Sequence, residues 1–117
     1  MPEQGSHWDE LALDRLRRFG GDGEVRELLS RFTVDIPTQL TAAREALSQG
    51  DAAAVGRSAR ALRSSATQLG AASMAELAGE IEEITCCGTL HGVRGALDEL
   101  SRQFERFVTW IDDRGTR

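Results

Sequence analysis

Three arginines recur at three-residue spacing near the middle of the chain, and they are the residues best suited to recognition chemistry. Arg57, Arg60 and Arg63 stand in a run that also holds Ser64 and Thr67. At about 100° per residue, a helix would place these residues on one outward arc, with Arg63 toward its flank. A guanidinium group donates paired hydrogen bonds to a carboxylate or a phosphoryl group. We therefore predict that these five residues form a partner-binding surface.

The positions beside the arginines have little side-chain bulk, Ala53 and Gly56 among them. Such a surface lets the backbone of another protein approach closely. A plainer interpretation also fits, because alanine, serine and arginine are all acceptable on an exposed helix face that binds nothing. The spacing alone does not decide between the two interpretations.

A second group of reactive side chains, Cys86, Cys87 and His91, raises the possibility of a zinc site. The cysteines are adjacent and no fourth ligand is indicated, so ordinary loop or core placement is the favoured interpretation. His91 is also a candidate phosphate acceptor, but it lies outside the run of small residues. We expect two free thiols in a reducing compartment, and no metal or cofactor.

Composition restricts the function further. We find no paired-carboxylate, glycine-rich phosphate-loop or Ser/His/Asp pattern, so we expect no catalytic residues and no enzyme. The net charge of −5, from 19 acidic and 14 basic residues, argues against nucleic-acid binding. No apolar stretch approaches the roughly 18 residues that cross a bilayer, and the first residues have no leader character. We expect a cytoplasmic protein, monomeric and without membrane contact.

The elements that must position the arginines are helical throughout, because apolar residues recur at spacings of three and four. The 117 residues suit one domain, residues 1–117, and with only 5% aromatic residues its core must be aliphatic. The runs Glu80, Glu82-Glu83 and Asp112-Asp113 are interpreted as solvated helix faces.

Five helices are predicted. The first covers residues 8–19 and ends at Gly20-Gly21; the second covers residues 23–48, with a kink near residues 33–36 caused by Pro37. The third begins after Asp51 as its N-cap and ends at Gly70.

The fourth helix is predicted to begin near Ser73, with Glu76 completing a capping box, and to stop near Gly88. The last covers residues 90–113. Four long amphipathic helices with short loops bury their apolar stripes only against one another. The predicted fold is all-α: an antiparallel four-helix bundle with a short additional N-terminal helix across one end, bringing Trp8 near Trp110.

Nearly the whole chain resembles the histidine-containing phosphotransfer (HPt) domain. The family's signature is His-x-Leu-Lys-Gly, followed by small residues and then Leu-Gly-Ala. Here the corresponding run is RALRSSATQLGA, residues 60–71, in which Leu62, Leu69, Gly70 and Ala71 match. The resemblance implies the five-helix plan, and it implies docking to an acidic Mg²⁺-binding pocket on a receiver domain.

The sequence departs from the family signature at the positions that would carry out phosphoryl transfer. Arg60 stands where the resemblance places the phosphorylatable histidine, Arg63 replaces the lysine and Ser64 replaces the glycine. Arginine stays protonated and has no free lone pair for phosphoryl transfer. The chain thus resembles a bacterial pseudo-HPt protein.

Such a protein would dock the receiver domain of a response regulator or hybrid histidine kinase without accepting phosphate, and would favour the unphosphorylated form. Two alternatives stay open: a phosphorelay component that uses another residue, and a bundle reused as a scaffold or dimerisation module.

Overall fold

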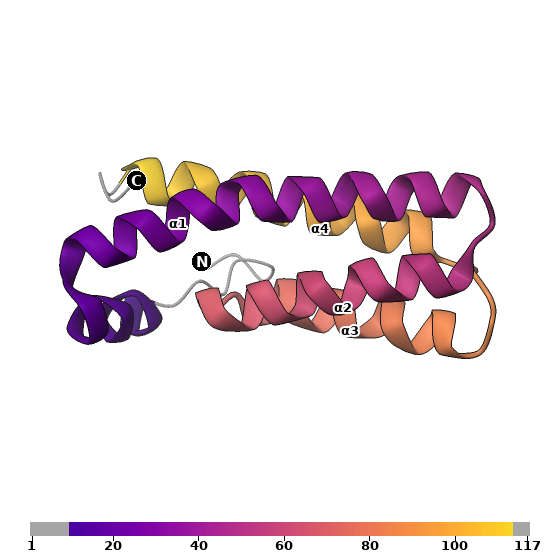
Figure 1. The fold of residues 1–117 in the computed structure, drawn as a ribbon, viewed down its shortest axis with the longest axis horizontal. Helices are drawn as coiled ribbons and strands as arrows, with labels where there is room; N and C mark the ends of the chain where they lie inside the picture. Colours follow the sequence, from indigo (N-terminus) through magenta and orange to yellow (C-terminus); the bar gives the residue numbers. More distant parts are fainter. Residues whose placement is uncertain (1–9, 114–117) are drawn as a thin grey trace, which may run out of the picture.

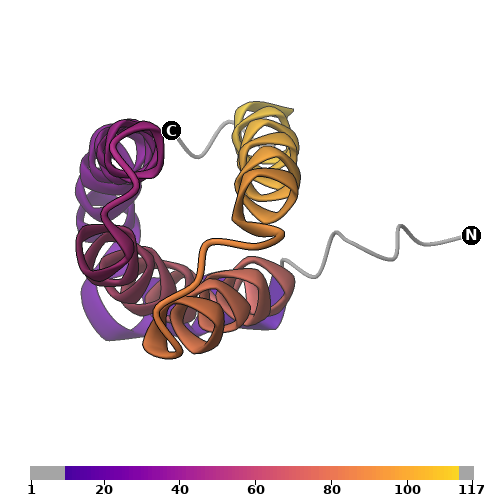
Figure 2. The same cartoon turned by 90° about the vertical axis from the view of Figure 1, so that its right-hand side faces the viewer.

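The structure is a computed structural model that describes residues 10–113, with the side chains of residues 26–112. It contains four helices: α1 (Glu10–Ser48), α2 (Ala52–Leu69), α3 (Ala72–Cys86) and α4 (Val93–Asp113). No strand occurs in residues 10–113. Consecutive helices run antiparallel (Figure 1), and each of the pairs α1–α2, α2–α3, α3–α4 and α1–α4 is in contact, which closes a ring around the core (Figure 2). The all-α bundle is confirmed.

The N-terminal part of the bundle differs from the sequence prediction in one respect. The predicted separate helix over residues 8–19 does not end at Gly20-Gly21, because α1 is a single helix from Glu10 to Ser48. Glycine raises the free energy of a helix by about 1 kcal/mol per residue but does not forbid helical dihedral angles, so a pair of glycines need not end a helix. The indigo start of α1 nevertheless turns away from the line of the rest of the helix (Figure 1).

The helix also continues past Pro37 without a break, as predicted. The kink expected near residues 33–36 remains a prediction. Trp8 lies outside the described residues, so its predicted approach to Trp110 is untested. Trp110 itself is half-buried and stacks on Phe107, with ring centroids 6.1 Å apart.

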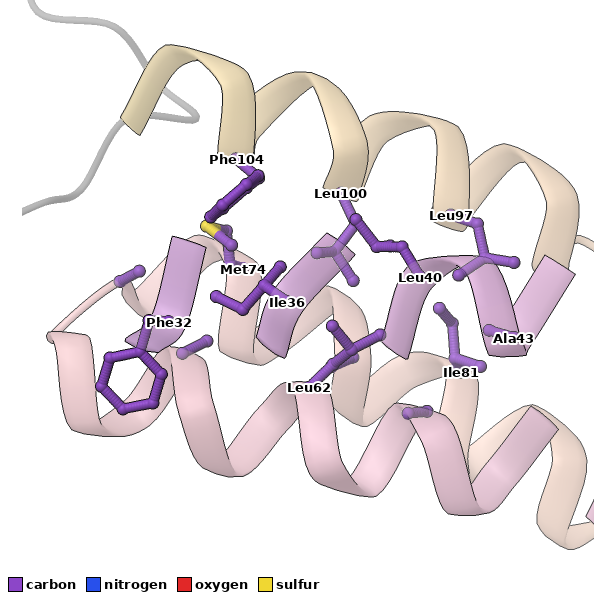
Figure 3. Close-up of a cluster of buried hydrophobic side chains, with 14 of the residues drawn as sticks. Phe32, Ile36, Leu40, Ala43, Leu62, Met74, Ile81, Leu97, Leu100 and Phe104 are labelled. Atoms are coloured by element: carbon purple, nitrogen blue, oxygen red, sulfur yellow. The ribbon is translucent and has the colours of Figure 1, made fainter. Parts of the chain in front are cut away.

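The core is mostly aliphatic, as the composition indicated, but it also buries Phe32, Phe104 and Phe107, and it draws on all four helices. In α2 every residue of the predicted inward seam is buried, at 3% exposure or less: Val55, Ala59, Leu62, Ala66 and Leu69. Around Leu62, Figure 3 shows Ile36 from α1, Ile81 from α3 and Leu97 from α4. Burying a side chain of this size contributes about 1.5–3 kcal/mol. This seam fixes the rotation of α2 and therefore which of its residues face outward.

The ends of α2 are set by the capping residues that the sequence indicated. The Asp51 carboxylate accepts a hydrogen bond from the Ala54 backbone N–H at 3.1 Å. At the other end Gly70 adopts a left-handed φ of 74°, and its N–H donates to the last carbonyls of the helix. Both predictions for this helix are confirmed.

The helix α3 begins at Ala72, close to the predicted start near Ser73, but the predicted capping box is wrong. Its N-cap is Ala71 rather than Ser73, and no side chain caps the first turn. The tight turn at Gly70 brings Ala71, which is 1% exposed, into the core directly after α2. The helix therefore begins earlier than a serine-based capping box allows, because burial of Ala71 decides where the chain turns.

One close approach between α2 and α3 controls the spacing of these two helices. A Cβ atom added to Gly56 would lie 2.8 Å from the Thr85 Oγ1 atom. Thr85 is buried, and its hydroxyl donates to the backbone carbonyls of Ile81 and Glu82 at 3.0 and 3.1 Å. The hydroxyl cannot rotate away without losing these bonds, so α2 lies this close to α3 only because residue 56 is glycine.

Polar groups organise the outer surface of α4. The Glu99 carboxylate accepts hydrogen bonds from Arg102 at 2.9 and 3.0 Å and from Gln103 Nε2 at 3.2 Å. These bonds, the one from Arg102 foremost, hold the pKa of Glu99 below its ordinary value. Across the helix pair, Arg44 of α1 forms an ion pair with Asp98 at 2.9 Å. None of the helices in residues 10–113 has an apolar stretch that would cross a membrane.

We expect Gly56→Ala to destabilise the protein by about 1 kcal/mol, because an overpacking cost of about 1–3 kcal/mol exceeds the helix-propensity gain of about 1 kcal/mol. Gly95 of α4 is the matched control, since nothing lies within 4 Å of its added Cβ. Gly95→Ala should stabilise by up to about 1 kcal/mol. Urea unfolding measures both; equal stabilisation by the two variants would contradict the close approach.

Glu99→Gln should reduce the free energy of unfolding at pH 7 by less than about 1 kcal/mol, because the carboxylate is partly exposed and solvent screens its pairs. A lowered folded pKa means that this stabilisation is present above the ordinary pKa of 4.5 and is lost as the pH falls through the folded value. Urea titrations of both proteins at pH 7 and pH 3 check this. A difference that does not shrink between pH 7 and pH 3 would show that the carboxylate charge is not its cause.

Candidate functional site

The outward face of α2 carries all five residues predicted to bind a partner. Arg57, Arg60, Arg63, Ser64 and Thr67 are all exposed, while the opposite side of the helix is buried in the core. The predicted arc is therefore present. The structure shows that the residues share one face. Their arginine side chains form two groups, one paired within the protein and one unpaired.

Arg63 forms an ion pair within the protein. Its guanidinium donates from Nε to Glu82 Oε1 of α3 and from Nη2 to Glu82 Oε2 at 3.4 Å, a paired contact across the two helices. The Glu82 side chain is only 23% exposed, so its carboxylate gains from a nearby cation. The Arg63 Cδ atom lies 3.5 Å from the place a Cβ on Gly79 would take, so the stem of Arg63 lies over this glycine.

Arg57 and Arg60 are free by comparison. In the described part of the chain, neither guanidinium has an ion-pair or hydrogen-bond partner, whereas Arg44, Arg63, Arg102 and Arg106 all have one. A cation that is exposed and unpaired keeps its donors available to an incoming group. Arg60 and Arg57 are thus the residues of this face that are ready to bind an anion.

A shallow groove of about 670 Å³ runs between α2 and α3 beside these arginines. We call it the α2–α3 groove. Arg57 and Arg60 line its α2 edge, Glu80 and Glu83 line its α3 edge, and Gly56 forms part of the wall between. The glycine contacts described above bring the two helices together and leave no bulky side chain to fill the space.

A second, smaller hollow of about 360 Å³ adjoins the first along α2. It is lined by Arg60, Arg63, Ser64, Thr67 and Gln68. Arg60 and Arg63 therefore line both hollows, and of these two only Arg60 has no ion-pair partner among the described residues. Ser64 and Thr67 contribute short hydroxyl side chains that leave the Arg60 guanidinium accessible.

This surface holds donors and no nucleophile suited to phosphoryl transfer. The described part of α2 contains no histidine, and arginine is protonated at every physiological pH. A guanidinium can bind a carboxylate or a phosphoryl group by two parallel hydrogen bonds, but it cannot form a bond to phosphorus. The arrangement is suited to holding an acidic group.

The cysteine and histidine cluster does not form a site. Cys86 and Cys87 are free and exposed at the end of α3, and His91 is exposed in the loop before α4. No group of three or more histidine, cysteine or acidic residues within the described chain is arranged to hold a metal ion. The structure gives the zinc alternative no support. His7 lies outside the described residues.

The sequence prediction missed the glutamates of α3 as part of this surface. Glu80, Glu82 and Glu83 were interpreted as a solvated face, yet all three line the α2–α3 groove. Helical spacing places them on an outward side of their own helix but does not say which neighbour that side meets. The pairing of α2 with α3 had to be known first.

Comparison with known proteins identifies relatives that share this fold. The model of the Hpt domain family matches residues 27–110. Among solved structures, histidine-containing phosphotransfer protein B (HptB) from Pseudomonas aeruginosa PAO1 is similar over 92% of this chain and 93% of that chain, at 25% sequence identity and a TM-score of 0.87. No curated protein sequence matches the chain.

The contact between Arg63 and Glu82 should stabilise the α2–α3 pair. In a double-mutant cycle of Arg63→Ala and Glu82→Ala, we expect a coupling energy of about 0.5–1 kcal/mol, the upper part of the range for ion pairs near a surface. The matched comparison is Arg44 with Asp98, whose side chains are 42% and 44% exposed. That pair should couple more weakly because it is more solvated. Zero coupling between Arg63 and Glu82 would contradict the paired contact.

Proposed function

Because the chain belongs to the Hpt domain family of phosphorelay proteins, we propose that it is a noncatalytic member that docks the receiver domain of a response regulator or hybrid histidine kinase without accepting phosphate. The observation that carries the proposal is Arg60, which stands at the phospho-acceptor position of the family motif. It is exposed, has no partner among the described residues, and lies between two hollows.

The proposal separates docking from transfer. Transfer requires a neutral nucleophile with a lone pair at position 60, and the guanidinium has none. Docking requires an accessible helix face with small side chains around a central anchor, and the exposed face of α2 has that form. Such a protein would sequester a receiver domain or compete with phosphotransfer partners for it.

Charge gives the docking its chemical basis. A receiver that is phosphorylated on an aspartate offers clustered carboxylates. A guanidinium group binds a carboxylate through two parallel hydrogen bonds. Arg57 lies one helical turn before Arg60 and adds a second unpaired cation. The unphosphorylated pocket is the preferred partner, because its carboxylates are not yet shared with a phosphoryl group.

The test is a binding titration against the receiver domains encoded with this protein. We expect Arg60→Glu to weaken binding at least about tenfold, as for a central charged anchor of an interface. The control is Arg31→Glu, which makes the same charge change at an exposed arginine of α1. Equal binding by the wild type and the Arg60→Glu variant would remove Arg60 from the mechanism.

A second measurement addresses the noncatalytic part of the proposal. Incubation with a phosphorylated receiver should leave no acid-labile phosphate on the wild type, because position 60 offers no nucleophile. Arg60→His, which restores an imidazole there, serves as the positive control. Acid-labile phosphate on the wild-type chain would instead support a phosphorelay component that uses another residue.

A further inference from the structure

The charges that line the α2–α3 groove do not cancel within the protein. Three arginines and three glutamates line it, and Arg63 with Glu82 forms the single ion pair among these six. The remaining charges are Arg57 and Arg60 on the α2 edge and Glu80 and Glu83 on the α3 edge, and none of the four has a partner among the described residues. We call these two pairs the basic edge and the acidic edge.

The groove between the two edges is open to an incoming side chain. Its wall includes Gly56, where the helices approach closely, and Gly79, which the stem of Arg63 covers. The edges face each other across this space without forming an ion pair, although they carry opposite charges. A partner group that enters the groove therefore meets carboxylates on one side and guanidinium groups on the other.

We propose that Glu80 and Glu83 are specificity-determining residues that bind a lysine or arginine side chain of the receiver, next to the acidic pocket that Arg60 engages. This inference rests on the proposed function and extends it to a second charge. Charge complementarity carries it, because a purely acidic partner surface would meet repulsion at the acidic edge, whereas a surface with a cation beside its carboxylates satisfies both edges.

The opposite charges of the basic edge and the acidic edge also fix the orientation of the receiver. A single anchor at Arg60 leaves the partner free to rotate about that contact, while a second contact of opposite sign on α3 allows one orientation. A mismatch in which the partner's cation meets Arg57 would place like charges together. The acidic edge thus selects among receivers that share an acidic pocket but differ in the charges around it.

The experiment compares the double variant Glu80→Gln/Glu83→Gln with the wild type in titrations against the same receiver domains at low and high salt. Each substitution keeps the size of the side chain and removes its charge. We expect binding about fivefold weaker at low salt, consistent with two partly exposed ion pairs, and a smaller difference at high salt. Glu76→Gln is the matched control, since Glu76 is exposed on α3 but does not line the groove.

Each outcome separates this inference from the proposed function. Unchanged or tighter binding by the double variant, with binding still lost in Arg60→Glu, would overturn the role of the acidic edge and leave receiver docking intact. No binding of any receiver by the wild type would overturn both. A second copy of this chain is the other candidate occupant of the groove, and sedimentation of the free proteins tests it. Self-association of the wild type that the double variant abolishes would overturn the assignment to a receiver.

Discussion

The close packing of α2 against α3 is the constraint on which the candidate site depends. Gly56 allows the helices to approach until the Thr85 hydroxyl fills the place of a side chain, and the buried seam of α2 fixes its rotation. Together these contacts point Arg57 and Arg60 outward and bring the glutamates of α3 beside them. A wider spacing or a rotated helix would change the charges that line the groove.

The surface that results presents exposed arginines and short hydroxyl side chains on one face of α2. Arg60 is exposed on α2, and its guanidinium offers paired hydrogen-bond donors. Arg63, which the sequence placed among the partner-binding residues, instead forms an ion pair with Glu82 of α3. The arginines of this helix thus differ in role within the fold: Arg63 links α2 to α3, whereas Arg57 and Arg60 have no ion-pair partner among the described residues.

Local signals predicted most of the fold. The spacing of Val55, Leu62 and Leu69 gave the inward side of α2, and Asp51 and Gly70 gave its ends, because caps and apolar stripes act within a few residues. The predictions that failed depended on longer-range contacts. Nothing near Gly20 shows that α1 continues through the glycines, and the serine at position 73 suggests a cap that the burial of Ala71 overrides.

For the site, the sequence by itself determined which side chains share the outward face of α2, and that position 60 carries an arginine. These facts follow from helical periodicity and from the chemistry of one residue type. Only the tertiary structure decided that Arg63 is paired, that Arg57 and Arg60 are not, and that Glu80 and Glu83 face them. Such pairings depend on which helices pack together and how closely, and helical periodicity carries no information about either.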